Sequence, residues 1–156
     1  MTDHSRLEFL VNTYEDTLYR AALAILGDVC EAEDAVQDAF LRCWEKAPEF
    51  DSPEHAKAWL LRVLVNGCRS RLRSPWRRRT VPLLESYPAA DPEERGTLEA
   101  IQALPAKERA VLHLYYYEGY KTAEIARLTG EREGTVRSRL SRARGKLKDL
   151  LKGEFQ

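Results

Sequence analysis

The 156-residue sequence lacks the residue patterns of common enzyme and metal sites. Its three cysteines, Cys30, Cys43 and Cys68, form no CxxC pair and no Cys/His metal spacing, so we expect reduced core residues. Its three histidines lie far apart, and there is no glycine-rich phosphate loop or nucleophile elbow. We therefore expect no enzymatic activity, no cofactor and no metal.

Long apolar stretches are also missing. No apolar run approaches the roughly 18 residues that a membrane helix needs. The N-terminus has no basic stretch followed by an apolar segment, so no secretory signal is visible. An apolar content of 44% with 32% charged residues is ordinary for a soluble globular protein. These absences predict a cytoplasmic protein without direct membrane insertion.

The formal net charge of zero hides charges that alternate in blocks. Residues 1–60 carry five basic and thirteen acidic groups, and residues 61–80 carry seven basic and no acidic ones. Residues 81–119 carry three basic and seven acidic groups, whereas residues 120–156 carry ten and five. Two basic surfaces and an acidic one are typical of a protein that contacts both nucleic acid and a basic protein partner.

Apolar residues recur at helical spacing through most of the chain, which predicts an all-α fold. Helices are expected at about 6–26, ended by Gly27, at 31–47, and from Pro53 to about Arg73 with Ser52 as N-cap. The pattern then dissolves around several prolines and resumes near residue 94. We predict two small helical domains, at 1–74 with three to four helices and at 94–156, joined by a flexible linker over 75–93.

The second and third helices each present an unusual outer face. The second helix has an acidic side, including Asp34 and Asp38, that also carries the large aliphatic Leu41. This favours a docking surface, although acids near a helix start also suit the helix dipole. The third helix carries a row at i, i+4, i+7 and i+11: Arg62, Asn66, Arg69 and Arg73. That row has no acidic partner within its own helix, which favours contact with a phosphate backbone.

The C-terminal stretch from Tyr120 to Leu151 has the pattern of a helix-turn-helix. A short helix around Ile125 is followed by a break at Gly130 and a longer helix with an apolar stripe. The opposite side of that longer helix carries basic and small hydroxyl side chains, as a helix in a DNA major groove requires. They are Arg137, Ser138, Ser141 and Arg142. A solvated amphipathic helix in an ordinary bundle is the competing interpretation.

The segment LPAKERAVLHLYYYEGYKTAEIARLTGEREGTVRSRLSRARGKL resembles region 4 of the extracytoplasmic-function sigma factors. Residues 32–40, AEDAVQDAF, resemble the core-binding helix of their region 2, and the stretch from Trp59 to Asn66 resembles the start of their promoter-melting helix. The resemblance covers nearly the whole chain. It implies an RNA polymerase sigma factor with regions 2 and 4, which directs promoter-specific transcription initiation.

The resemblance also implies partners and site residues. Region 2 of this family docks on the coiled coil of the largest polymerase subunit, and region 4 contacts the flap of the second-largest one. The implied core-binding residues are Asp34, Gln37, Asp38, Leu41 and Arg42. The implied minus-10 DNA residues are Phe50, Asp51, Ser52, Arg62, Asn66, Arg69 and Arg73. The implied minus-35 DNA residues are Arg132, Glu133, Thr135, Arg137, Ser138 and Arg142. Because sigma factors of this family are commonly regulated by an anti-sigma factor, the resemblance also implies an anti-sigma factor as a partner.

The sequence departs from the family pattern in the turn before the recognition helix. The family usually places an aliphatic residue and then a serine cap there, and this chain has Glu131 and Arg132. A carboxylate at a normally buried turn position has to point outward or find a partner. Two other functions remain as hypotheses: a helix-turn-helix regulator that does not initiate transcription, and a helical interaction module unrelated to DNA.

Overall fold

A computed structural model describes residues 3–75, 77 and 91–154. Within those residues the chain forms seven α-helices and one π-helical segment, without a β-strand, which confirms the all-α prediction. No helix in the described part combines the length and the apolar character needed to cross a membrane. The predicted linker lies mainly outside the described residues.

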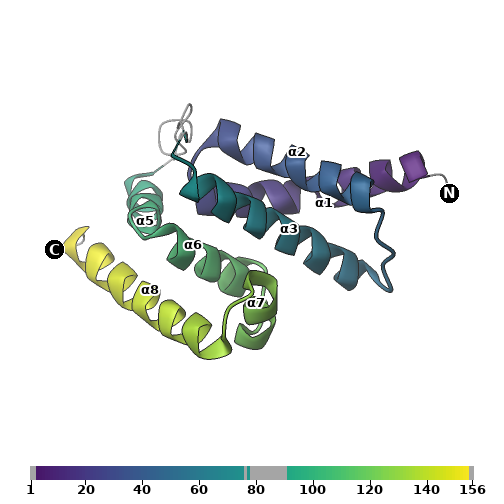
Figure 1. Cartoon of the computed structure of the whole chain (residues 1–156). Coiled ribbons are helices and arrows are strands. Elements are labelled where there is room, and N and C mark those ends of the chain that lie inside the picture. Colours follow the sequence, from purple (N-terminus) through teal and green to yellow (C-terminus); the bar gives the residue numbers. More distant parts are fainter. Residues whose placement is uncertain (1–2, 76, 78–90, 155–156) are drawn as a thin grey trace.

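The first three helices form one bundle (Figure 1). They are α1 (Asp3–Leu26), α2 (Val29–Lys46) and α3 (Pro53–Arg73). Gly27 ends α1 with a φ of 68°, a left-handed conformation that glycine adopts without steric cost. Asp28 caps α2 by accepting a hydrogen bond from the Glu31 N–H, and Ser52 caps α3 by accepting one from the His55 N–H. The predicted start of the third helix at Ser52–Pro53 is therefore confirmed.

The second unit begins at α5 (Pro92–Gln102) and continues through α6 (Ala106–Leu112). The chain then runs through the π-helical η1 (His113–Tyr117), α7 (Thr122–Thr129) and α8 (Glu133–Glu154). Gly130, with a φ of 70°, makes the turn between α7 and α8. The structure therefore contains the predicted helix-turn-helix.

The π-helical segment falls on a run of three tyrosines. The Glu118 N–H donates to the carbonyl oxygen of His113, an i→i+5 bond of 3.1 Å that widens the helix by one residue. Leu114 is fully buried in this turn, whereas Tyr116 and Tyr117 keep 58% and 54% of their surface exposed. Two of the three tyrosines therefore have rings at the surface.

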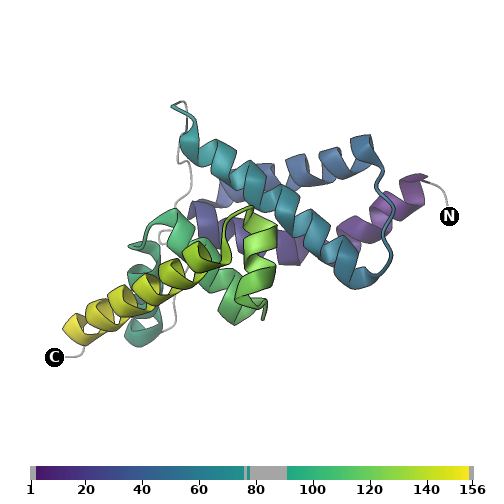
Figure 2. The same cartoon turned by 60° about the horizontal axis from the view of Figure 1, so that its bottom comes forward.

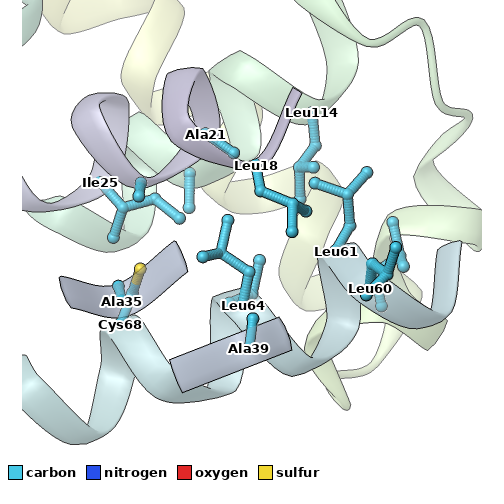
Figure 3. Packing of buried hydrophobic residues seen from close by; sticks show 14 of the residues in the cluster. Leu18, Ala21, Ile25, Ala35, Ala39, Leu60, Leu61, Leu64, Cys68 and Leu114 are labelled. Atoms are coloured by element: carbon cyan, nitrogen blue, oxygen red, sulfur yellow. The ribbon is translucent and has the colours of Figure 1, made fainter. Parts of the chain in front are cut away.

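The two helical units pack against each other: α6 lies against α1, and α7 lies against α3 (Figures 1 and 2). Buried residues of both units belong to one hydrophobic cluster, and Figure 3 shows Leu114 beside Leu18 of α1 and Leu61 of α3. Because the second unit covers part of α3, the buried side of that helix is wider than periodicity predicted. Leu61, Val65 and Cys68 are buried, whereas Trp59 and Val63 are only half-buried.

Candidate polymerase and promoter surfaces

The predicted core-binding residues share the outward face of α2. All of them are exposed: Asp34, Gln37, Asp38, Leu41 and Arg42. Leu41 has 58% of its surface exposed, so none of the described elements covers this large aliphatic side chain. Asp38 also forms an ion pair with Arg71 of α3, which fixes its carboxylate at the edge of this face. The structure thus places an apolar side chain among charged ones.

Trp44 extends this surface, and the sequence interpretation missed it. Helical spacing places Trp44 on the same side of α2 as the buried Phe40, but 47% of the Trp44 surface is exposed. It lies three residues after Leu41, and both side chains line a groove of about 500 Å³ between α1 and α2 together with Leu7, Val11 and Phe40. The spacing Leu41-x-x-Trp44 could have identified this pair from the sequence, because residues at i and i+3 are neighbours on a helix.

The loop before α3 contains three predicted minus-10 residues in different environments. The Phe50 ring is half-buried and packs edge-on against His55 and Trp59, with ring centroids 5.3 and 5.8 Å away. The Ser52 hydroxyl accepts the capping hydrogen bond from the His55 N–H at 3.1 Å. The Asp51 side chain is 99% exposed. Phe50 and Ser52 therefore have structural contacts, and Asp51 is the member open to a ligand in this conformation.

The basic row on α3 is only partly open. Arg62, Asn66 and Arg73 are exposed, whereas Arg69 turns toward the second unit and forms an ion pair with Glu131. The row was expected to have no acidic partner within its own helix, and the partner of Arg69 indeed lies elsewhere, 62 residues further along the chain. Beyond the row, Arg77 pairs with Glu31 and donates to the carbonyl oxygen of Leu26 at 2.7 Å.

The recognition helix α8 presents most of its predicted minus-35 residues to solvent. Arg132, Glu133, Arg137, Ser138 and Arg142 are exposed, and Thr135 is half-buried. An open concave surface is lined by residues that are basic, small or hydroxyl-bearing: Arg132, Gly134, Thr135, Arg137, Ser138, Ser141 and Arg142. The Thr122 hydroxyl at the start of α7 donates to Glu133 Oε1 at 3.0 Å and ties the two helices of the motif together.

Glu131 is the least ordinary residue of this motif. Its carboxylate accepts hydrogen bonds from Nη1 of Arg139 at 2.7 and 2.6 Å and pairs with Arg69. Burial alone would raise the Glu131 pKa, but the hydrogen bond and charge of Arg139 and the charge of Arg69 outweigh burial, so its pKa is lowered. Glu131 is therefore an ionised, half-buried carboxylate held between two arginines.

Family models match both units of this chain. A model described as sigma-70 region 2 matches residues 10–78, and one described as sigma-70 region 4 matches residues 95–147. The extracytoplasmic-function (ECF) sigma factor SigM of Mycobacterium tuberculosis is 34% identical over 96% of this chain and 79% of its own length. The chain belongs to the ECF family of RNA polymerase sigma factors. Region 2 is used below for residues 1–74 and region 4 for residues 94–156.

Other relatives agree with this assignment. SigL of Mycobacterium tuberculosis is 36% identical over 84% of this chain and 80% of its own length. A probable sigma factor of Xanthomonas campestris pv. campestris, RfaY, is 37% identical over 94% of this chain, which spans only 40% of that relative. Sigma factors are non-enzymatic initiation factors that bind core RNA polymerase and promoter DNA.

Two solved structures share the arrangement. The sigma factor RpoE of Bartonella quintana, solved with the anti-sigma factor NepR, superposes with a TM-score of 0.74 at 28% identity, covering 91% of this chain and 94% of RpoE. CnrH in complex with the cytosolic domain of CnrY superposes with a TM-score of 0.70 at 28% identity, covering 96% of this chain and 90% of CnrH. Both structures contain a bound protein partner.

Proposed function

We propose that this sigma factor binds polymerase and promoter DNA through three surfaces on its two units. The exposed face of α2 docks on the coiled coil of the largest polymerase subunit. The basic row of α3 and the loop before it contact the minus-10 element, and the exposed face of α8 reads the minus-35 element as duplex. Region 4 also contacts the flap of the second-largest subunit. The chain catalyses no reaction of its own and acts in the cytoplasm.

The observation that carries this proposal is the exposed Leu41–Trp44 pair among charged residues of α2. A large apolar pair that the described part of the chain leaves uncovered favours a protein partner. A simple DNA-binding regulator has no use for such a docking face beside a basic row on the neighbouring helix. The combination therefore supports initiation with core polymerase over DNA binding alone.

The test is run-off transcription by core polymerase reconstituted with this chain. Because the promoter is not given by the sequence, templates are first selected from a random library by their retention on the reconstituted holoenzyme. We expect discrete transcripts that require the chain and start a fixed distance from an enriched two-part motif. Retained DNA without any transcript would instead favour the regulator that does not initiate.

A protein inhibitor is part of this proposal. The similar sigma factor RpoE has been solved with the anti-sigma factor NepR, and the similar protein CnrH with the cytosolic domain of CnrY. We propose that an anti-sigma factor likewise binds this chain and withholds it from polymerase. Affinity purification of the tagged chain from its own cells, followed by run-off assays with the co-purified protein added back, tests this. The added protein should suppress transcription in proportion to its amount.

A further inference from the structure

Region 4 is fastened to the DNA-reading helix of region 2 by ionic hydrogen bonds. Arg69 Nη1 donates to the carbonyl oxygen of Thr129 at 2.5 Å, and its Nη2 donates to the Glu131 carboxylate. Arg139 of α8 holds the same carboxylate from the other side. The side chains of Arg69 and Glu131 keep only 25% and 18% of their surface exposed, so solvent screens this contact weakly. We call Arg69, Thr129, Glu131 and Arg139 the latch.

The latch engages the Arg69 side chain, to which the proposed function assigns a contact with DNA. Arg69 belongs to the row with Arg62, Asn66 and Arg73, whose other members are exposed. A carboxylate presents an arginine with the same charge and forked acceptor geometry as a phosphate. Glu131 therefore fills the position on Arg69 that a minus-10 phosphate would take, and the two cannot bind there together.

The packing of region 4 on α3 is also incompatible with a two-element promoter. Elements named minus-10 and minus-35 lie about 25 base pairs apart, and at about 3.4 Å per base pair that is roughly 85 Å of duplex. In the structure, α7 and the turn leading into α8 lie directly against α3 (Figure 2). One molecule cannot place both surfaces on one straight promoter until the two regions separate.

We propose that the latch holds this sigma factor in a closed state that cannot engage a promoter, with Glu131 acting as an internal substitute for DNA phosphate. The inference rests on the proposed role of α3 and α8 in promoter reading. Binding of core polymerase is then what draws region 4 away from α3.

The test measures opening directly in the free full-length chain. Fluorophores on Ser70→Cys and Lys148→Cys, in a Cys30→Ser background, report the separation of the regions by single-molecule energy transfer. Both labelled side chains are exposed, one on each region. At 100 mM KCl the parent should show a predominant high-transfer state. Glu131→Gln should raise the ratio of open to closed molecules about tenfold, as expected for the loss of one charge-assisted hydrogen-bonded contact.

Matched variants separate the latch from a general loss of charge. Glu99→Gln removes a carboxylate whose partner among the described residues is Arg95 on its own helix, so it should leave the ratio within twofold of the parent. Arg69→Gln should open the chain at least as much as Glu131→Gln, and the double variant no more than Arg69→Gln, because both remove the same contact. Circular dichroism confirms that each variant is folded.

Each outcome decides the proposal. A parent that is already open at 100 mM KCl, or a Glu131→Gln variant with an unchanged ratio, overturns the latch. The readout needs neither polymerase nor promoter, so it is independent of the run-off assay. If Glu131→Gln opens a chain that never supports transcription, the latch stands and the proposed function fails. If transcription is robust and Glu131→Gln does not open the chain, only the latch fails.

Discussion

Arg109 of region 4 donates a hydrogen bond from Nε to the carbonyl oxygen of Ala24 in region 2, at 2.9 Å. Its guanidinium also reaches the carbonyl oxygen of Ile25 and that of Leu104 in its own region. Ala24 and Ile25 lie in the last turn of α1, where carbonyl groups lack intrahelical partners and carry partial negative charge. Arg69 does the reverse by capping the end of α7. Each region therefore supplies an arginine that caps a helix of the other.

Replacing Arg109 should destabilise the folded chain. Arg109→Ala removes a buried guanidinium, 6% exposed, that serves three carbonyl groups, and should lower the free energy of unfolding by about 2–4 kcal/mol. Arg109→Lys should recover little of this, because an ammonium does not reproduce the planar fork. Urea unfolding followed by circular dichroism measures both. Glu99→Ala, which removes the exposed i,i+4 pair with Arg95, is the control and should cost less than about 0.5 kcal/mol.

Features of the fold that depend on residues close together in the sequence were predictable, and those that depend on distant residues were not. The ends of α1, α3 and α7 were predictable because Gly27, Ser52–Pro53 and Gly130 act within one turn of the chain. The exposure of Trp44 was not predictable, since periodicity shows that a helix has an apolar side but not which residue at its edge is covered.

The same distinction between local and distant contacts applies to the candidate binding surfaces. The basic faces of α3 and α8 follow from residue type and spacing, so their exposed members were predicted correctly as outward-facing. The partner of Arg69 lies 62 residues away and comes from the packing of region 4 on region 2, which no local pattern encodes. The odd residue at that turn, Glu131, was the available signal, because a half-buried carboxylate requires a partner.

Truncating Leu41 should weaken binding to core polymerase without affecting the fold. Leu41→Ala removes an exposed apolar side chain, so stability should change by less than about 0.5 kcal/mol, while the dissociation constant for core polymerase should rise about tenfold or more. Fluorescence anisotropy of the labelled chain measures this affinity. Phe9→Ala is the matched control, because Phe9 is similarly exposed on α1 but lies outside the groove beside α2. Equal effects of the two substitutions would contradict the docking face.

Arg137 distinguishes base reading from phosphate contact on α8. If Arg137 reads a base edge, Arg137→Ala should cost about 1–3 kcal/mol of promoter binding and relax preference at one position of the minus-35 element. The measurement is holoenzyme binding to a set of promoters that carry every single-base change across that element. A uniform loss over all sequences would make Arg137 a phosphate contact. Arg127→Ala, on an exposed arginine of α7 outside the predicted contacts, should leave the sequence preference unchanged.

His113 should make the stability of the fold depend on pH. Its ring stacks on Tyr117 with centroids 4.8 Å apart, and its Nε2 is buried without a hydrogen-bond partner among the described residues. Burial lowers the His113 pKa below its ordinary value of 6.5. The charge of Glu118 partly opposes this shift, and the charge of Arg20 adds to it. Because the unfolded chain binds the proton more readily, the free energy of unfolding should be highest above pH 6.5. It should fall as the pH drops from 6.5 toward the folded pKa and level off below that pKa.

The measurement is urea unfolding at pH values between about 5.5 and 7.5, a window above the range in which most carboxylates titrate. His113→Gln removes the titrating group, so its free energy of unfolding should vary less across this window than that of the parent. His4→Gln, at an exposed position on α1, should retain the parent's dependence. If the His113→Gln and parent profiles run parallel, His113 is not the buried neutral group that its environment indicates, since only a difference in proton binding between the folded and unfolded chains produces this slope.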